Sequence, residues 1–160
     1  MSLTQLRSRG ILDGTISAGD LATGVGGKVL QVVTATDSTQ RTTTSSSFVT
    51  ASNTLSVSIT PSSSSNKIFV LVTNGGQADG ANAVYTIYRD STNLGNGNDG
   101  MYSAGGNEGR TNTTMSILDS PATTSAITYQ VYLRTTTGGN TCYSSMQNVK
   151  ASITAFEIKG

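Results

Sequence analysis

The segment AITYQVYLR, residues 126–134, decides the fold class because its side chains alternate in hydrophobicity with a period of two. One face carries Ile127, Tyr129, Val131 and Leu133. The other face carries Thr128, Gln130, Tyr132 and Arg134. This period is typical of a β-strand with one buried and one exposed face. The segment therefore predicts such a strand, with the aliphatic side directed inward.

The same alternation recurs from residue 28 onward, where no segment has a helical period. The other predicted strands span residues 28–36, 54–60, 66–74, 83–90, 113–118, 141–146 and 151–158. Residues 28–36 are apolar on both faces, which predicts a strand covered on both sides. The Asn-Gly-Gly at residues 74–76 predicts a turn after the preceding strand. Short strands separated by Gly, Ser, Thr and Asn predict an all-β protein, an antiparallel jelly-roll-like sandwich of about eight strands.

The 160 residues are enough for one ordinary domain, which we place at residues 28–160. Residues 1–27 have sparse, irregular apolar side chains among glycines, and such a segment forms no core of its own. We interpret it as an extended N-terminal arm whose apolar residues fit grooves on a partner. A disordered leader is the alternative. The candidate anchoring residues are Leu3, Leu6, Ile11, Leu12, Ile16 and Leu21.

Charge and composition disfavour several functional classes. Ten basic and nine acidic residues give a net charge of +1 with no basic stripe, which argues against nucleic-acid binding. The amino terminus lacks an apolar run of signal-peptide length, and no stretch is apolar enough to insert in a membrane. Cys142 is the single cysteine, so no internal disulfide forms, and we expect it to be an inert buried residue. A chain without disulfides is consistent with synthesis in a reducing cytoplasm.

No catalytic, metal or cofactor site is expected. The chain has no histidine, so Ser-His and Cys-His nucleophile pairs are absent. The segment NLGNGNDG, residues 93–100, superficially resembles a calcium loop but lacks the spaced acids and the terminal Glu of one. We interpret it as a flexible turn.

Residues 91–112 are predicted to form one long loop, since about twenty residues exceed the usual hairpin connection. Tyr on an Asn- and Gly-rich loop suits recognition of sugars or proteins. An unconstrained surface loop is the alternative. The candidate receptor-binding or subunit-contact residues are Asn96, Asp99, Tyr102, Asn107, Glu108 and Arg110.

Two stretches carry a resemblance to a known family. ILDGTISAGDLATGVGGKVLQVV, residues 11–33, resembles segments of bacteriophage tail fibres and related virion appendage proteins, in which such units precede a β-rich terminal domain. ITPSSSSNKIFVLV, residues 59–72, is similar to the sandwich head domains of such fibres. The resemblance implies a homotrimer formed through one sheet face, an amino-terminal part joined to the virion, and distal loops that face outward. A typical fibre has a long shaft before its head, whereas here 27 residues precede the domain, so a short fibre tip or a decoration protein is expected.

The sequence therefore leads to three functional hypotheses. The first is a non-enzymatic, trimeric tail-fibre protein, assembled into virions in the host cytoplasm, whose arm binds phage tail or capsid proteins and whose loops bind a host-surface glycan or protein. The second is a capsid or tail decoration (cement) protein that stabilises the particle. The third and least favoured is a spike-like polysaccharide hydrolase that uses Asp99 and Glu108 as its acids.

Overall fold

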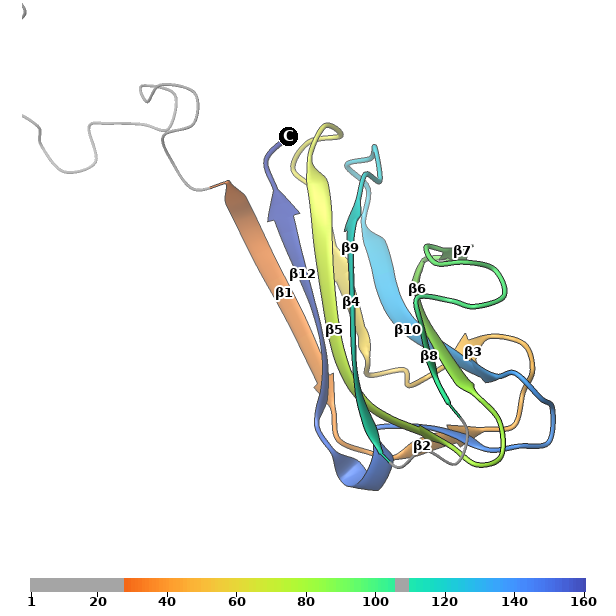
Figure 1. Cartoon of the computed structure of the whole chain (residues 1–160). Coiled ribbons are helices and arrows are strands. Elements are labelled where there is room, and N and C mark those ends of the chain that lie inside the picture. The colour runs from red at the N-terminus through yellow and green to blue at the C-terminus, as the bar shows by residue number, and fades with distance from the viewer. Residues whose placement is uncertain (1–27, 106–109) are drawn as a thin grey trace, which may run out of the picture.

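The computed structural model describes residues 28–105 and 110–160, which form two antiparallel β-sheets packed face to face (Figure 1). Apart from one 3-10 turn at Met146–Asn148, the regular structure of these residues consists of strands. This arrangement confirms the predicted all-β class and the pair of antiparallel sheets.

The first sheet, which we name the β5 sheet, is centred on the long strand β5. Its members are β1 (Val29–Asp37), β2 (Arg41–Thr43), β5 (Lys67–Ala78), β9 (Thr111–Asp119), β11 (Cys142–Ser144) and β12 (Ala151–Ile158). On one side of β5, β12 pairs with its first part and β11 with its end, while β9 pairs along the other side. Strand β1 pairs with the far side of β12, and β2 pairs with β11. The sheet is therefore four strands wide.

The second sheet, which we name the β10 sheet, has two long strands at its centre. Its members are β3 (Val49–Thr50), β4 (Ser56–Ile59), β6 (Ala83–Arg89), β7 (Thr92–Asn93), β8 (Tyr102–Ala104) and β10 (Ile127–Thr135). Strands β10 and β6 pair with each other. The short strands β3 and β4 pair with the outer side of β10, and β7 and β8 pair with the outer side of β6. The chain thus crosses repeatedly from one sheet to the other as it proceeds.

The core lies between the sheets and follows the alternation seen in the sequence. The four aliphatic and aromatic residues of the inner face of β10 are buried, as are the alternating aliphatic residues of β5 and β12. Tyr85 and Tyr129 are the largest fully buried side chains. The Tyr85 hydroxyl donates to the carbonyl oxygen of Tyr143 at 2.5 Å, and the Tyr129 hydroxyl donates to Asp119 at 2.6 Å. Both rings can therefore fill the core because each hydroxyl has a partner.

The number of strands differs from the prediction. The described residues form twelve strands rather than about eight, because β2, β3, β7 and β8 were not predicted. Each of the four has two or three residues, and so short a segment shows no hydrophobic period.

The turn predicted at residues 74–76 is also wrong, since β5 continues through these residues to Ala78. A Cβ atom at Gly76 would lie 2.4 Å from the Tyr85 hydroxyl oxygen, so the glycine allows the two sheets to approach instead of reversing the chain. The strand predicted at residues 141–146 ends early, at Ser144. Ser145 adopts a left-handed conformation with φ 50°, which breaks the extended backbone.

Strand β1 is not covered on both sides, contrary to the prediction. Val29, Leu30 and Val32 are 50%, 45% and 52% exposed. The reason is that the described residues form two sheets, so the outward face of β1 lies at the surface, and at the edge of its sheet β1 has a neighbouring strand on one side alone. Apolar residues on both faces of a strand therefore marked, in this case, an uncovered surface rather than a central strand.

Candidate binding surfaces

Residues 91–112 do not form one long loop. Strands β7 and β8 pair back onto β6, and β9 already begins at Thr111. Tyr102, predicted to be a loop residue free for recognition, packs partly buried against the core, with its ring centroid 6.3 Å from that of Tyr85. The segment is therefore a folded edge of the β10 sheet over most of its length.

The turn at residues 96–100 uses the side chain of Asn96 internally. Asn96 and Gly100 exchange backbone hydrogen bonds of 3.0 and 2.9 Å, and Asn96 Oδ1 accepts from the backbone N–H groups of Asn98 and Asp99. Asn96 is thus a turn residue rather than a free ligand group. Asp99 and Arg110 are exposed, whereas Asn107 and Glu108 lie outside the described residues. The separation of Asp99 from Glu108 that a hydrolase would need is therefore not defined.

Glycines in this segment permit close packing on β6. A Cβ atom at Gly95 would lie 2.6 Å from Thr86 Oγ1, and one at Gly100 would lie 2.5 Å from the carbonyl oxygen of Tyr85. The turn covers the outward face of β6, where Val84 and Thr86 are buried. The residues that predicted flexibility instead bring the backbone against the sheet.

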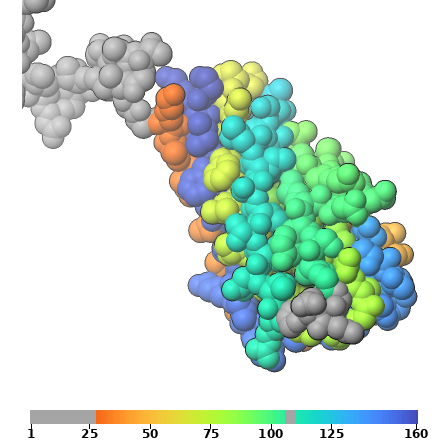
Figure 2. Space-filling model, viewed as in Figure 1, coloured from red at the N-terminus to blue at the C-terminus, as the bar shows by residue number. Residues whose placement is uncertain are grey.

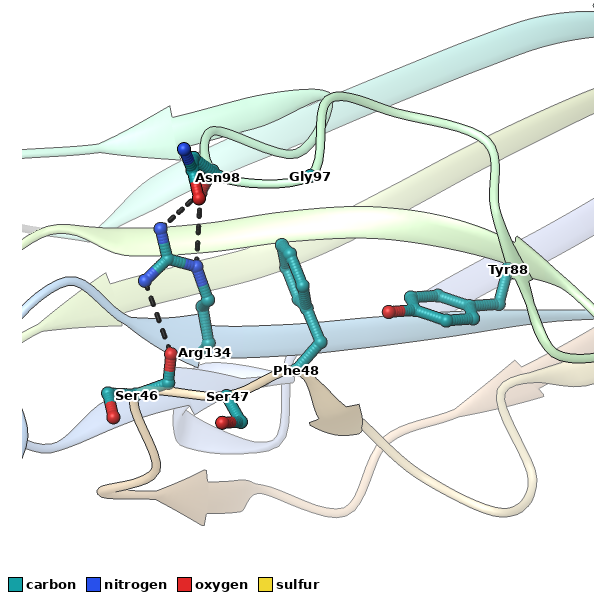
Figure 3. Close-up of a pocket in the computed structure, with 7 residues that line it drawn as sticks. All are labelled: Ser46, Ser47, Phe48, Tyr88, Gly97, Asn98 and Arg134. Atoms are coloured by element: carbon teal, nitrogen blue, oxygen red, sulfur yellow. Dashed lines mark hydrogen bonds between the residues drawn. The ribbon is translucent and has the colours of Figure 1, made fainter.

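An open hollow of about 370 Å³ lies beside this turn, on the outward face of the β10 sheet (Figure 3). Four separate parts of the chain line it: residues 46–48 before β3, Tyr88 from β6, residues 97–98 of the turn, and Arg134 from β10. Arg134 Nε donates to the carbonyl oxygen of Asn98 at 3.1 Å, and Nη2 donates to the same oxygen. Arg134 Nη1 donates to the carbonyl oxygens of Ser46 and Thr135, both at 3.3 Å. Arg134 therefore joins the two walls of the hollow.

Aromatic rings form the floor beside Arg134. The Arg134 guanidinium carbon lies 5.4 Å from the centroid of the Phe48 ring. The Phe48 and Tyr88 rings meet edge to face with centroids 6.2 Å apart, and Tyr88 stacks on Tyr132 at 4.0 Å. Such contacts hold the rings in fixed positions. The sequence analysis missed this hollow; the one signal was a phenylalanine within a Ser- and Thr-rich stretch.

A second candidate surface is the outward face of the β5 sheet. One cross-strand row on it is entirely apolar, because Val32 pairs with Phe156, Phe156 with Phe69, and Phe69 with Leu118. The Phe69 and Phe156 rings lie 6.0 Å apart, and Leu118 is 52% exposed. We name these four residues the apolar row. Strands β1, β12, β5 and β9, which carry it, lie next to one another at the surface in Figure 2.

The rest of this face is almost free of charge. Next to the apolar row, this face presents hydroxyl side chains. Among them, the hydroxyl groups of Thr34 and Thr154 are hydrogen-bonded at 3.0 Å, and those of Thr73 and Ser152 at 2.9 Å. Among the described outward side chains of β1, β12, β5 and β9, Lys67 alone is charged. An exposed apolar row on a face with so little charge is typical of an interaction site on a small protein.

Two buried carboxylates fasten the sandwich. Glu157 is 1% exposed, and its oxygens accept from Ser62 N–H (2.6 Å), Ser62 Oγ (2.7 Å), Asn66 Nδ2 (2.6 Å) and Gln31 Nε2 (2.8 Å). Burial by itself raises the pKa of Glu157, but the hydrogen bonds from Asn66, Ser62 and Gln31 outweigh it and lower the pKa to about 2. The carboxylate therefore stays ionised and ties β12 and β1 to the segment after β4.

Asp37, at the end of β1, is held in the same way. Burial raises its pKa, yet hydrogen bonds from Ser52, Thr39 and Thr54 lower it to about 2. Neither carboxylate belongs to a cluster that resembles a catalytic pair or a metal site. In the described part of the chain no three His, Cys, Asp or Glu side chains are grouped so as to hold a metal ion.

Cys142 is fully buried, and burial raises the pKa of its thiol to about 11.

The described residues contain no helix of a length and hydropathy that would span a bilayer. The predicted anchoring residues, from Leu3 to Leu21, lie outside the described residues.

No protein-family model matches the chain, and no curated protein matches it in sequence.

Proposed function

We propose that the chain is a non-enzymatic structural subunit of a bacteriophage virion, a short trimeric tail-fibre protein. Residues 1–27 attach it to phage tail or capsid proteins, and the domain of residues 28–160 faces the host surface. The resemblance of residues 11–33 and 59–72 to virion appendage proteins supports the class of protein. The observation that carries the proposal is the apolar row exposed on the outer face of the β5 sheet, a face that is almost free of charge and suits assembly with other subunits.

We propose further that the sandwich is a jelly roll. The order of strands supports this: the first strand lies beside the last, β5 lies between the last strand and β9, and the second sheet places β4 beside β10 and β6 beside β8. Wrapping one long hairpin of strands into two sheets produces this order.

The size of the exposed face is adequate for self-association. Four strands about 4.8 Å apart and roughly eight residues long, at about 3.3 Å per residue, cover on the order of 500 Å² in outline. A standard interface buries about 800 Å² of accessible surface per partner. Because side-chain relief increases accessible area above the outline area, this one face comes close to that requirement. Each subunit of a trimer would bury part of it against each neighbour.

Light scattering on the purified full-length chain tests the proposal. We expect a mass near three times the 16.5 kDa of one chain. Val32→Lys and Leu118→Lys place a charge in the apolar row at positions exposed in the single chain, so each variant should fold and yet dissociate. Asn53→Lys is the control, because Asn53 is also exposed but lies in the loop between β3 and β4 of the β10 sheet. A wild-type monomer, or dissociation by the control alone, would contradict the proposal.

A monomer in solution would favour a capsid or tail decoration protein instead. The same exposed face and the open edge of β1 would then be covered by lattice neighbours, and the chain would stabilise the particle by binding only the assembled form. Immunogold labelling of particles separates the two, since label at the tail ends fits a fibre and label over the shell fits decoration.

A further inference from the structure

The hollow beside Arg134 carries a positive charge that no carboxylate neutralises. Among the described residues, the arginines with an acidic partner are Arg41, which pairs with Asp37, and Arg89, which pairs with Asp119. The partners of Arg134 are three backbone carbonyl oxygens, which orient the guanidinium group and leave its charge in place. A guanidinium group that is held in position and has no carboxylate partner can bind an anion.

Next to this charge the hollow offers an aromatic ring and unused polar groups. The Phe48 ring stands between Arg134 and Tyr88 (Figure 3). In the described structure the hydroxyls of Ser46 and Ser47 and the side-chain amide of Asn98 make no hydrogen bond, and all three residues are exposed. The hollow thus combines an aromatic side chain, free hydrogen-bond donors and acceptors, and a cationic group within one small volume.

We propose that this hollow binds a sugar unit that bears a carboxylate, such as a hexuronic acid of a surface polysaccharide. One face of a pyranose ring is apolar and packs against the part of Phe48 that lines the hollow, while the carboxylate meets the Arg134 guanidinium. The ring hydroxyls bond to the Ser46, Ser47 and Asn98 side chains. A volume of about 370 Å³ lies near the lower end of small-molecule sites, about 300–1,000 Å³, which suits a single sugar unit.

The proposal deepens the host-binding part of the proposed function and rests on it only for its biological meaning. Sugar binding is measured on the purified chain, whereas membership of a virion is measured by labelling particles, so either can fail without the other. Weak binding at one site is sufficient, because several copies on a particle raise the avidity by orders of magnitude.

Titration of the isotope-labelled full chain by NMR tests the proposal, with sodium glucuronate, glucose and sodium acetate as separate probes. We expect saturable shifts of the Phe48, Gly97 and Asn98 amide signals with glucuronate. Glucuronate should bind about tenfold more tightly than glucose, since the carboxylate adds a charge-assisted contact. Acetate, which lacks the ring, should give no saturable shift at the same concentrations.

Three variants assign the contacts. Arg134→Gln should remove the preference for glucuronate over glucose, and Phe48→Leu, which retains the apolar volume but not the flat ring, should weaken both sugars. Lys150→Gln, which removes an exposed charge outside the hollow, is the control and should change neither affinity. A well-dispersed amide spectrum shows that each variant is folded. The proposal is overturned by the absence of a saturable shift with glucuronate, by equal binding of acetate, or by an equal loss in Lys150→Gln.

Discussion

Replacing Glu157 with glutamine should make the stability of the sandwich less sensitive to acid. The pKa of this carboxyl falls from 4.5 to about 2 on folding because Asn66, Ser62 and Gln31 donate to the ionised form. At about 1.4 kcal/mol per pKa unit, the shift corresponds to about 3 kcal/mol of stability. Because the folded pKa is the lower one, this contribution is complete above about pH 5 and is lost as the pH falls through 2.

The variant should therefore be less stable than the wild type at neutral pH, and the difference should shrink in acid. Glutamine has no charge, and its Nε2 group would face the Nε2 donor of Gln31. We expect the difference in unfolding free energy between wild type and Glu157→Gln to be smaller at pH 2.5 than at pH 7 by roughly 2–3 kcal/mol. Asp37, whose pKa is also about 2, titrates in both proteins and cancels in this comparison.

Urea denaturation followed by circular dichroism, at one fixed protein concentration, measures both free energies. Asp99→Asn, which removes a charge from an exposed turn, is the control and should change stability by no more than about 0.5 kcal/mol. A difference between wild type and Glu157→Gln that stays constant from pH 7 to pH 2.5 would refute the reasoning.

Two further predictions follow from the core. Gly76→Ala should destabilise the protein by about 1–3 kcal/mol, because its Cβ would clash with the hydrogen-bonded hydroxyl of Tyr85. In the same denaturation experiment Gly138→Ala, which has open space around it, should change little; equal effects would show that close packing is not the cause. Cys142 should resist a thiol-labelling reagent in the native protein and react in urea, since it is fully buried. Rapid labelling of the folded chain would contradict that expectation.

The long strands could be predicted from the sequence because each shows its own alternation. Residues 126–134 and 151–158 each contain a complete pattern of buried and exposed positions, and β10 and β12 occupy nearly those ranges. The short strands could not be predicted, since their existence depends on which long strand lies beside them. Glycines were ambiguous for a related reason. Asn-Gly-Gly fits a turn, but Gly76 serves a close approach that only the packed structure reveals.

The candidate surfaces were less accessible to sequence reasoning than the fold. Val32 is apolar in a strand that is apolar on both faces, and its exposure depends on the position of β1 at a sheet edge. Phe48 and Arg134 are far apart in the sequence and meet only after β3 pairs with β10. The outward position of Arg134, which is partly buried, fits the predicted polar face of residues 126–134, but its neighbours could not be inferred.

The pairing of β1 with β12 has a consequence for how the protein is made. These two strands lie at opposite ends of residues 29–158, yet each forms a main part of the same sheet. The β5 sheet cannot close until residues 151–158 have emerged from the ribosome, so the domain completes its fold only after all of its strands have been made. Contacts of such high sequence separation slow folding to about milliseconds to seconds. During that interval one side of β5 is unpaired, and newly made chains are open to strand exchange with one another before each completes its own sheet.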